Sequence, residues 1–485
     1  MTKQRVAVST ARFIGSTALL ALAVFATSCA GAPRPPAKPV PASTTPAASM
    51  TPAERRLQGL EQASALLKKG QTDAAAELIA KLIAAEPGST ELKLMHAAVL
   101  VSAGKLPAAR AEVDTLLTAD PNNTKALVMA IQMARLAGDD AARRSLLNRA
   151  IAASPQDAHV LTAWGQYHLD AKNWSMAEDF FRRALASEPK NPDASLGLGR
   201  ALFRESKYAE AEAELSDAIS LDPTSPLAYD DRSRVRIQLG NVAGARSDLD
   251  QAVAKAPASA WIRIDRGRFL LDQGSRDLAF QDFTKAIDLE PDYFLPYVYR
   301  AGICEETGRD GQAILDYRKI IALYPDYWYA FESAGAVAFR LGLWSESAAD
   351  FGVAFTKDPK RYEYAIASAL ALWRGGKAKA ASAYAGGIAP TVDREKNGIY
   401  WAMFRLIQDQ NDESSDLELR IEAEKGLDLK AAMLFYLGEY WLCRQKPAIA
   451  RACFDKSGEL RRKQTLEYRL MQAELHRMGT APSNG

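Results

Sequence analysis

Apolar, small and polar residues recur along most of this chain with a period of 34 residues. The period is clearest in nine prolines that share one register: Pro87, Pro121, Pro155, Pro189, Pro223, Pro257, Pro291, Pro325 and Pro359. We count each unit from the residue 31 places before its proline, so that units begin at residue 56 and every 34 residues up to residue 328. A fixed period of this length predicts a solenoid, in which one supersecondary unit is stacked many times.

Three places within each unit are constrained in residue size. The eighth place is usually small, as in Gly165 and Gly199, and the twentieth is usually alanine, as in Ala177 and Ala211. The twenty-fourth place is large and apolar in all nine units, as in Phe181. This spacing predicts two helices of about 13 residues that approach closely at the small places. The proline ends the second helix because it lacks an amide proton and disfavours a helical predecessor.

The small–small–aromatic–proline spacing resembles that of the tetratricopeptide repeat. The resemblance covers residues 56–359 in strict phase, and it predicts nine repeats over residues 53–359. It implies an all-α fold, in which tandem helix-turn-helix units form a right-handed superhelical solenoid. In that family the first helix of each unit lines a concave groove.

Beyond Pro359 the phase weakens, and residues 360–485 are predicted to hold degenerate repeats and a cap. Residues 394–410 include a strongly apolar helix, and residues 431–457 restore the unit with a glycine, an alanine and a phenylalanine at the expected spacing. Residues 461–478 are predicted to form a final helix. Solenoids need an atypical, partly polar terminal unit, and this segment fits that role.

The N-terminal residues have the pattern of a secretory signal. Residues 1–13 carry three positive charges and no acid, and residues 14–26 form an apolar run that is too short to span a bilayer. Small residues directly before Cys29 resemble the bacterial lipobox. We therefore predict a lipoprotein signal peptide over residues 1–28 and lipidation of Cys29. The alternative is an ordinary signal that happens to precede a cysteine.

Residues 29–52 are rich in proline, alanine, serine and threonine and lack acidic and aromatic residues. Such a segment cannot bury enough apolar surface to fold, and its prolines favour extended conformations. It is predicted to be a disordered linker between the lipidated cysteine and the repeats. By the resemblance, Ala30 after the cysteine favours the outer membrane, because it is not the aspartate that retains some lipoproteins at the inner membrane.

Composition and motifs argue against an enzyme and against a nucleic-acid-binding protein. The formal net charge is +2, and no basic domain of the nucleic-acid-binding kind is visible. The four histidines form no HExxH pattern, and neither a phosphate loop nor a nucleophile elbow is present. We predict no catalytic residue, no metal site and no cofactor. Cys304, Cys443 and Cys453 are interpreted as free thiols, with a Cys443–Cys453 disulfide as the less favoured alternative.

Two rows of arginine recur at the unit period. Arg232, Arg266 and Arg300 occupy the seventh place, and the same units carry Asp248, Asp282 and Asp316 at the twenty-third place. Units with Trp164 or Leu198 at place seven lack that aspartate. This co-occurrence predicts an Arg–Asp pair that ties the two helices of each unit together, which is a structural role.

The second row lies at the ninth place, which lines the groove in the family. We predict a partner-binding site from this row and from neighbouring aromatic and apolar residues of places two and five: Arg200, Arg234, Arg268, Trp261, Ile264, Leu295, Val298 and Tyr329. Guanidinium groups suit carboxylates and phosphates, and arginine and aromatic residues dominate binding hot spots. The alternative is a solvated face with local ion pairs.

The sequence therefore predicts a non-catalytic scaffold or adaptor of the bacterial cell envelope. It would be anchored in the membrane by the lipid on Cys29 and would hold a peptide or helix of an envelope protein in its groove. One alternative is a helper in cell-wall or surface-polysaccharide assembly or export. Another is a subunit that docks a membrane complex through its convex face. Fold alone does not decide between them.

Overall fold

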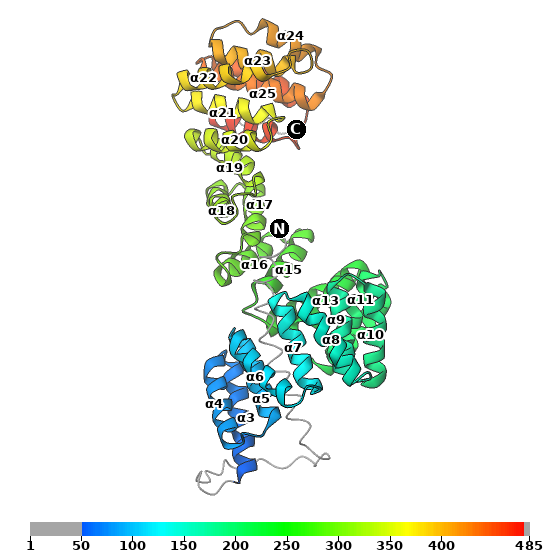
Figure 1. The fold of residues 1–485 in the computed structure, drawn as a ribbon. Coiled ribbons are helices and arrows are strands. Elements are labelled where there is room, and N and C mark those ends of the chain that lie inside the picture. Colours follow the sequence, from blue (N-terminus) through cyan, green and yellow to red (C-terminus); the bar gives the residue numbers. More distant parts are fainter. Residues whose placement is uncertain (1–50, 480–485) are drawn as a thin grey trace, which may run out of the picture. The chain divides into compact units, whose positions relative to one another are not determined.

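The computed structural model describes residues 51–479, and every regular element within this range is a helix (Figure 1). The chain divides into two compact units between Ala256 and Pro257. Each unit is described by itself below. The predicted signal peptide, Cys29 and all of the predicted linker up to residue 50 lie outside the described residues.

The first unit is a series of helix pairs, drawn from blue to green in Figure 1. Consecutive helices pack against each other, as expected for a tetratricopeptide solenoid. The pairs are α3 (Pro52–Lys68) and α4 (Thr72–Ala85), α5 (Thr90–Ser102) and α6 (Leu106–Ala119), α7 (Thr124–Ala137) and α8 (Asp140–Ala153), α9 (Ala158–Asp170) and α10 (Trp174–Ser187), α11 (Pro192–Arg204) and α12 (Tyr208–Leu221), α13 (Pro226–Gln238) and α14 (Val242–Lys255).

The second unit continues with the same kind of pair and then departs from it. The in-phase pairs are α15 (Ala260–Asp272) and α16 (Arg276–Leu289), α17 (Leu295–Glu306) and α18 (Asp310–Leu323), α19 (Tyr329–Arg340) and α20 (Trp344–Lys357). The remaining elements are α21 (Tyr362–Arg374), α22 (Ala378–Ile388), the short 3-10 helix η2 (Ala389–Thr391), α23 (Gly398–Asp409), α24 (Ser415–Ala423), α25 (Leu427–Cys443), α26 (Pro447–Glu459) and α27 (Leu466–Arg477).

The periodic prolines end the second helix of each in-phase pair, as predicted. The residue before each proline is the C-cap of that helix, with φ near −130° to −145°. This extended conformation is the one that a following proline imposes, because its ring clashes with a helical predecessor. The next unit then begins after a short turn.

Small residues at place eight allow the large residue at place twenty-four to fill the space between helices. A Cβ added to Gly165 would lie 2.7 Å from Phe181, and one added to Gly197 would lie 2.3 Å from the same ring. The Phe181 ring is 1% exposed and is therefore enclosed by α9, α10 and α11. Gly197 is thus a packing residue.

The turn inside each helix pair contains a residue with positive φ at place fifteen. Glycine, which adopts this conformation without steric cost, provides it in most pairs: Gly70, Gly104, Gly138, Gly240, Gly274, Gly308, Gly342 and Gly376. Lys172 and Ser206 occupy the same place with φ of 61° and 62°. Both side chains are exposed.

The C-terminal helices of the second unit fold back onto earlier ones. Helix α25 packs against α21, and α27 packs against both α25 and α19. The predicted apolar helix of residues 394–410 is α23, and the predicted final helix is α27. Gly438 and Phe454 form the expected close contact, since a Cβ on the glycine would lie 2.4 Å from the ring. No helix within residues 51–479 combines the length and the apolar character needed to cross a bilayer.

Candidate partner-binding site

The seventh-place arginines pair with the twenty-third-place aspartates, which confirms that prediction. In each pair two guanidinium nitrogens donate to the two carboxylate oxygens, over distances of 2.7–2.9 Å. The aspartates are 2–3% exposed. The pairs are Arg232–Asp248, Arg266–Asp282 and Arg300–Asp316.

These pairs belong to wider networks that occupy their hydrogen-bonding capacity. Arg232 also donates to the hydroxyl of Ser216 (3.0 Å), and Arg300 donates to that of Thr284 (3.1 Å). Asp248 accepts a further bond from Arg236 (2.9 Å). Because their polar atoms are engaged within and between helix pairs, these residues stabilise the fold and are not candidates for partner binding.

The ninth-place arginines of the first unit, which were predicted to bind a partner, are engaged by acidic residues of the same chain. The Nε atom of Arg200 lies 2.5 Å from Asp231. Arg234 pairs with Asp230 (2.6 Å) and with Asp231 (3.1 Å). The alternative, a face with local ion pairs, therefore describes these two residues. An anionic partner would first have to displace their carboxylates.

Arg268 in the second unit is more open. Its side chain is 53% exposed, and its nearest ion-pair contact is a long one of 3.7 Å to Asp265. The guanidinium group lies over the ring of Tyr299, 5.9 Å from the centroid. Arg268 thus remains accessible to a partner at the face where the sequence placed it.

The predicted aromatic and apolar residues divide into exposed and buried ones. Trp261 is 45% exposed and Tyr329 is 55% exposed, whereas Leu295 and Val298 are half-buried. Tyr329 stacks on Trp328 with the ring centroids 4.0 Å apart. Ile264 is 1% exposed, so its side chain is not available to a partner, and this corrects its assignment to the site.

The same face is covered at the C-terminal end of the second unit. Places two, five, nine and twelve share one side of a helix, because they are three or four residues apart. On α21, Ile366 and Leu370 at places five and nine are 0% exposed. At place twelve, Trp373 packs edge-on against Tyr440 of α25 (5.4 Å). The accessible part of the face in this unit therefore lies on α15, α17 and the start of α19.

A buried charge cluster joins α21, α25 and α27. Arg374 donates to Glu439 (2.9 Å) and Glu474 (3.3 Å), which are 0% and 1% exposed, and Glu474 pairs with Arg477. Burial raises the pKa of Glu439 to about 7, although Arg374 and Arg477 oppose the shift. Sequence reasoning missed this cluster. The available signal was a single acid, Glu439, inside an otherwise apolar helix.

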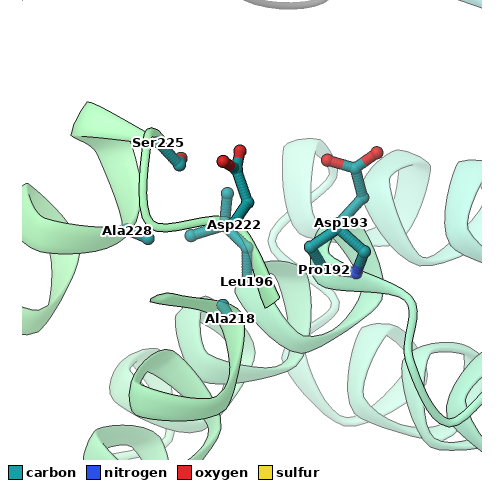
Figure 2. Close-up of a pocket in the computed structure, with 7 residues that line it drawn as sticks. All are labelled: Pro192, Asp193, Leu196, Ala218, Asp222, Ser225 and Ala228. Carbon is teal, nitrogen blue, oxygen red and sulfur yellow. The ribbon is translucent and has the colours of Figure 1, made fainter. Parts of the chain in front are cut away.

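The first unit has a small cavity between α11, α12 and the start of α13 (Figure 2). Its volume is about 20 Å³, which is room for about one water molecule. The carboxylates of Asp193 and Asp222 extend from its rim in Figure 2. Within residues 51–479 no group of three or more histidine, cysteine or acidic residues is arranged to hold a metal ion. The three described cysteines are free, as interpreted from the sequence.

Two family models of the tetratricopeptide repeat match the chain, one over residues 66–136 and the other over residues 162–226 and 231–294. No curated protein matches. Tetratricopeptide repeats are protein–protein interaction modules, and the matched segments lie within the helix pairs described above.

Several solved structures are similar to this chain at low sequence identity. One is the APC/C hetero-tetramer Cut9-Hcn1, with 16% identity, a TM-score of 0.47, and coverage of 65% of this chain and 62% of that chain. A second is pilF of Pseudomonas aeruginosa, with 17% identity, a TM-score of 0.38, and coverage of 42% and 92%. A third is a tetratricopeptide repeat protein of Parabacteroides merdae, with 20% identity, a TM-score of 0.37, and coverage of 51% and 97%. Repeat spacing, paired helices and family matches together identify this chain as a tetratricopeptide-repeat protein.

Proposed function

We propose that this protein is a scaffold of the bacterial cell envelope that holds a segment of a partner protein on the exposed face of its second unit. The segment is an extended peptide or a helix, and it contacts Trp261, Arg268, Leu295, Val298 and Tyr329. A lipid on Cys29 anchors the scaffold in the membrane. The repeats supply the protein-binding role, while the envelope and the lipid anchor are inferred from the N-terminal sequence.

The exposure of Trp261 and Tyr329 carries this proposal. Among the large hydrophobic side chains that are exposed within residues 51–479, these two are the aromatic ones. Both occupy place two of a first helix, and the half-buried Leu295 occupies that place in the unit between them. Aromatic and arginine side chains contribute most to binding hot spots. An exposed row of this kind, with Arg268 on the same helix as Trp261, has the composition of a protein-binding surface.

Replacing Trp261 and Tyr329 together with alanine is expected to weaken partner capture at least tenfold. An aromatic anchor contributes about 2 kcal/mol or more to binding, and about 1.4 kcal/mol corresponds to a factor of ten. Stability should change little, because both side chains are exposed. The measurement is affinity capture of envelope proteins from membrane extracts, followed by titration of the captured partner.

The matched control replaces Leu278 and Leu315, which are 43% and 63% exposed on the second helices α16 and α18 of the same unit. This control should capture the partner as the unmodified protein does. Loss of capture in the control, with retention in the Trp261/Tyr329 variant, would assign binding to the opposite face.

The anchor is tested separately with a Cys29→Ala variant, which is expected to move from the membrane fraction to the soluble fraction. Acyl chains hold a protein on a bilayer through burial of about 0.8 kcal/mol per CH₂ group, so removing the acceptor thiol removes the anchor. Cys304→Ala, which removes a buried thiol in α17, serves as the control and should remain in the membrane fraction. A Cys29→Ala protein that stays fully membrane-bound would refute lipidation as the anchor.

The membrane that carries the anchor is proposed to be the outer one, with the repeats facing the periplasm. The support is Ala30, which is not the retention aspartate of some inner-membrane lipoproteins. Separation of inner and outer membranes by density, followed by immunodetection of the protein, tests this assignment.

A further inference from the structure

The C-terminal helix α27 lies on the first helices of earlier repeats. It contacts α19, and α25 covers the neighbouring helix α21. On α19, Ala336 and Phe339 at places nine and twelve are each 1% exposed, although Tyr329 at place two is open. A helix of this protein therefore occupies the kind of face that is proposed above to bind a partner in the first half of the same unit.

Polar contacts fix α27 in this position. One guanidinium nitrogen of Arg477 donates to the carbonyl oxygens of Phe339 (2.6 Å) and Arg340 (2.9 Å) at the end of α19. A cation at a helix C-terminus interacts favourably with the helix dipole. Arg469 approaches Glu305 of α17 (3.4 Å), and Glu474 approaches Arg374 of α21 (3.3 Å).

Apolar contacts accompany these ion pairs. Leu470 and Met471 are 0% exposed, and Leu475 is 7% exposed. The docked side of α27 thus has an amphipathic sequence. The adjacent apolar residues Leu470 and Met471 are followed by a Glu-x-x-Arg pair, which Glu474 and Arg477 form. This pattern describes the chemistry that the face formed by α19 and α25, together with Arg374 of α21, accepts.

The acceptor and donor groups that α27 would leave behind, Arg374 and Glu305, also have partners outside α27. If α27 left, Arg374 would keep Glu439 (2.9 Å). Glu305 would keep Arg340 (3.0 Å), which is also bound to Asp310. Breaking a buried ion pair is costly mainly when one charge is left alone, and that situation does not arise for these groups.

Helix α27 also contains an ion pair of its own. Glu474 and Arg477 are three residues apart on α27 and pair with each other, so they leave together. Release also breaks the hydrogen bond that the hydroxyl of Tyr436, on α25, donates to Glu467 (2.9 Å). Helix α27 has 12 residues and follows the turn after α26, so it can detach while the preceding helices stay in place. An isolated helix of this length is only marginally stable, so α27 is ordered by docking.

We propose that the face formed by α19 and α25, with Arg374 of α21 as an ion-pair partner, is a second docking surface, which takes an amphipathic partner helix with the same apolar and Glu-x-x-Arg pattern. Helix α27 is its occupant in the resting chain, and the partner helix binds by replacing α27. This inference extends the proposed scaffold function, but it involves none of the residues of the Trp261–Tyr329 surface. An experiment can therefore refute one of the two proposals without affecting the other.

The test uses the full chain and a fluorescent peptide with the sequence of residues 465–479. Glu474→Ala together with Arg477→Ala weakens the docking of α27 and leaves the receiving face unchanged. The peptide is expected to bind this variant at least tenfold more tightly than the unmodified chain. A peptide with lysine in place of the glutamate corresponding to Glu474 is the control and should not bind. Equal binding of the peptide to both chains, or binding to neither, overturns the proposal.

Hydrogen exchange on the unmodified chain tests the docking of α27 without any substitution. Amides of α27 are expected to exchange at least a hundredfold faster than those of α25, because α27 opens on its own. Equal protection of the two helices would show that α27 is a fixed part of the core and would reject the proposal. Dimers that form by exchanging α27 between copies would place a second copy on the face and would reject the partner assignment.

Discussion

Replacing Asp316 with alanine is expected to cost about 3–5 kcal/mol of the stability of the α17–α18 pair. Asp316 is 2% exposed and accepts bonds from two nitrogens of Arg300 and from the side chain of Gln312 (3.1 Å). The variant leaves the guanidinium group of Arg300, which is 11% exposed, without its carboxylate. An uncompensated buried charge causes losses of this size. Repeats can open separately, so the measurement is native-state hydrogen exchange of the α17 and α18 amides.

Two controls separate the charge effect from a packing effect. Replacing Arg300 and Asp316 together with leucine should recover more than half of the loss, because two apolar residues leave no charge unpaired. Replacing Glu306, which is 55% exposed and pairs with Arg276 at the surface, should cost only about 0–1 kcal/mol. If the single and double variants lose the same stability, the Arg300–Asp316 pair does not couple the two helices.

The stability of the C-terminal part is expected to fall as the pH rises from about 4.5 to about 7. Burial raises the pKa of Glu439 from 4.5 to about 7, so the folded chain binds this proton more tightly than the unfolded chain does. The associated stability is fully present below the unfolded pKa and is lost as pH rises through the folded pKa. A shift of this size corresponds to on the order of 3 kcal/mol. Urea unfolding at pH 5 and pH 8, followed by tryptophan fluorescence, measures the difference.

Glu439→Gln should remove most of this pH dependence and should be at least as stable as the unmodified protein at pH 8. Glutamine resembles the protonated acid and still offers Arg374 an acceptor oxygen. Glu459→Gln, at an exposed position of α26, is the matched control and should leave the profile unchanged. An unaltered pH profile in Glu439→Gln would show that Glu439 is ionised in the folded protein at neutral pH.

The pairing within repeats was predictable from the sequence because it follows from geometry. Antiparallel helices bring together places whose numbers add up to about thirty, and seven and twenty-three satisfy this condition. The presence of arginine and aspartate in the same units then identified Arg300 and Asp316 as partners. The small residues at place eight were also predictable from geometry. A large side chain at place twenty-four, such as that of Phe181, needs a small residue on the facing helix.

Contacts between successive repeats were harder to predict. Arg200 pairs with Asp231, which lies 31 residues later at place six of the next unit. Comparison of residues within each unit does not reveal such a pair. The useful signal was the acid at place six in the unit that follows a place-nine arginine, as Asp231 follows Arg200 and Asp265 follows Arg234.

The return of the C-terminal helices could not be predicted from the repeat pattern. The phase is lost after Pro359, and no fixed spacing relates Arg374 to Glu439 or Glu474. These groups are 65 and 100 residues apart in the sequence, so only the folded chain brings them together. Trp261 and Tyr329 are exposed at the places where the sequence put them, but Ile264 was not recognised as buried, because place five is buried in some units and half-buried in others.

The turns at Lys172 and Ser206 bear on the heat tolerance of this protein. A side-chain-bearing residue in the left-handed region costs about 1 kcal/mol more than glycine does. Eight equivalent turns avoid this cost with glycine, whereas the turns after α9 and α11 do not. Both residues are exposed, and neither belongs to the Arg–Asp pairs of places seven and twenty-three. Glycine in place of Lys172 and Ser206 would therefore stabilise the middle of the first unit against heat. Neither substitution alters a surface that is proposed to bind a partner.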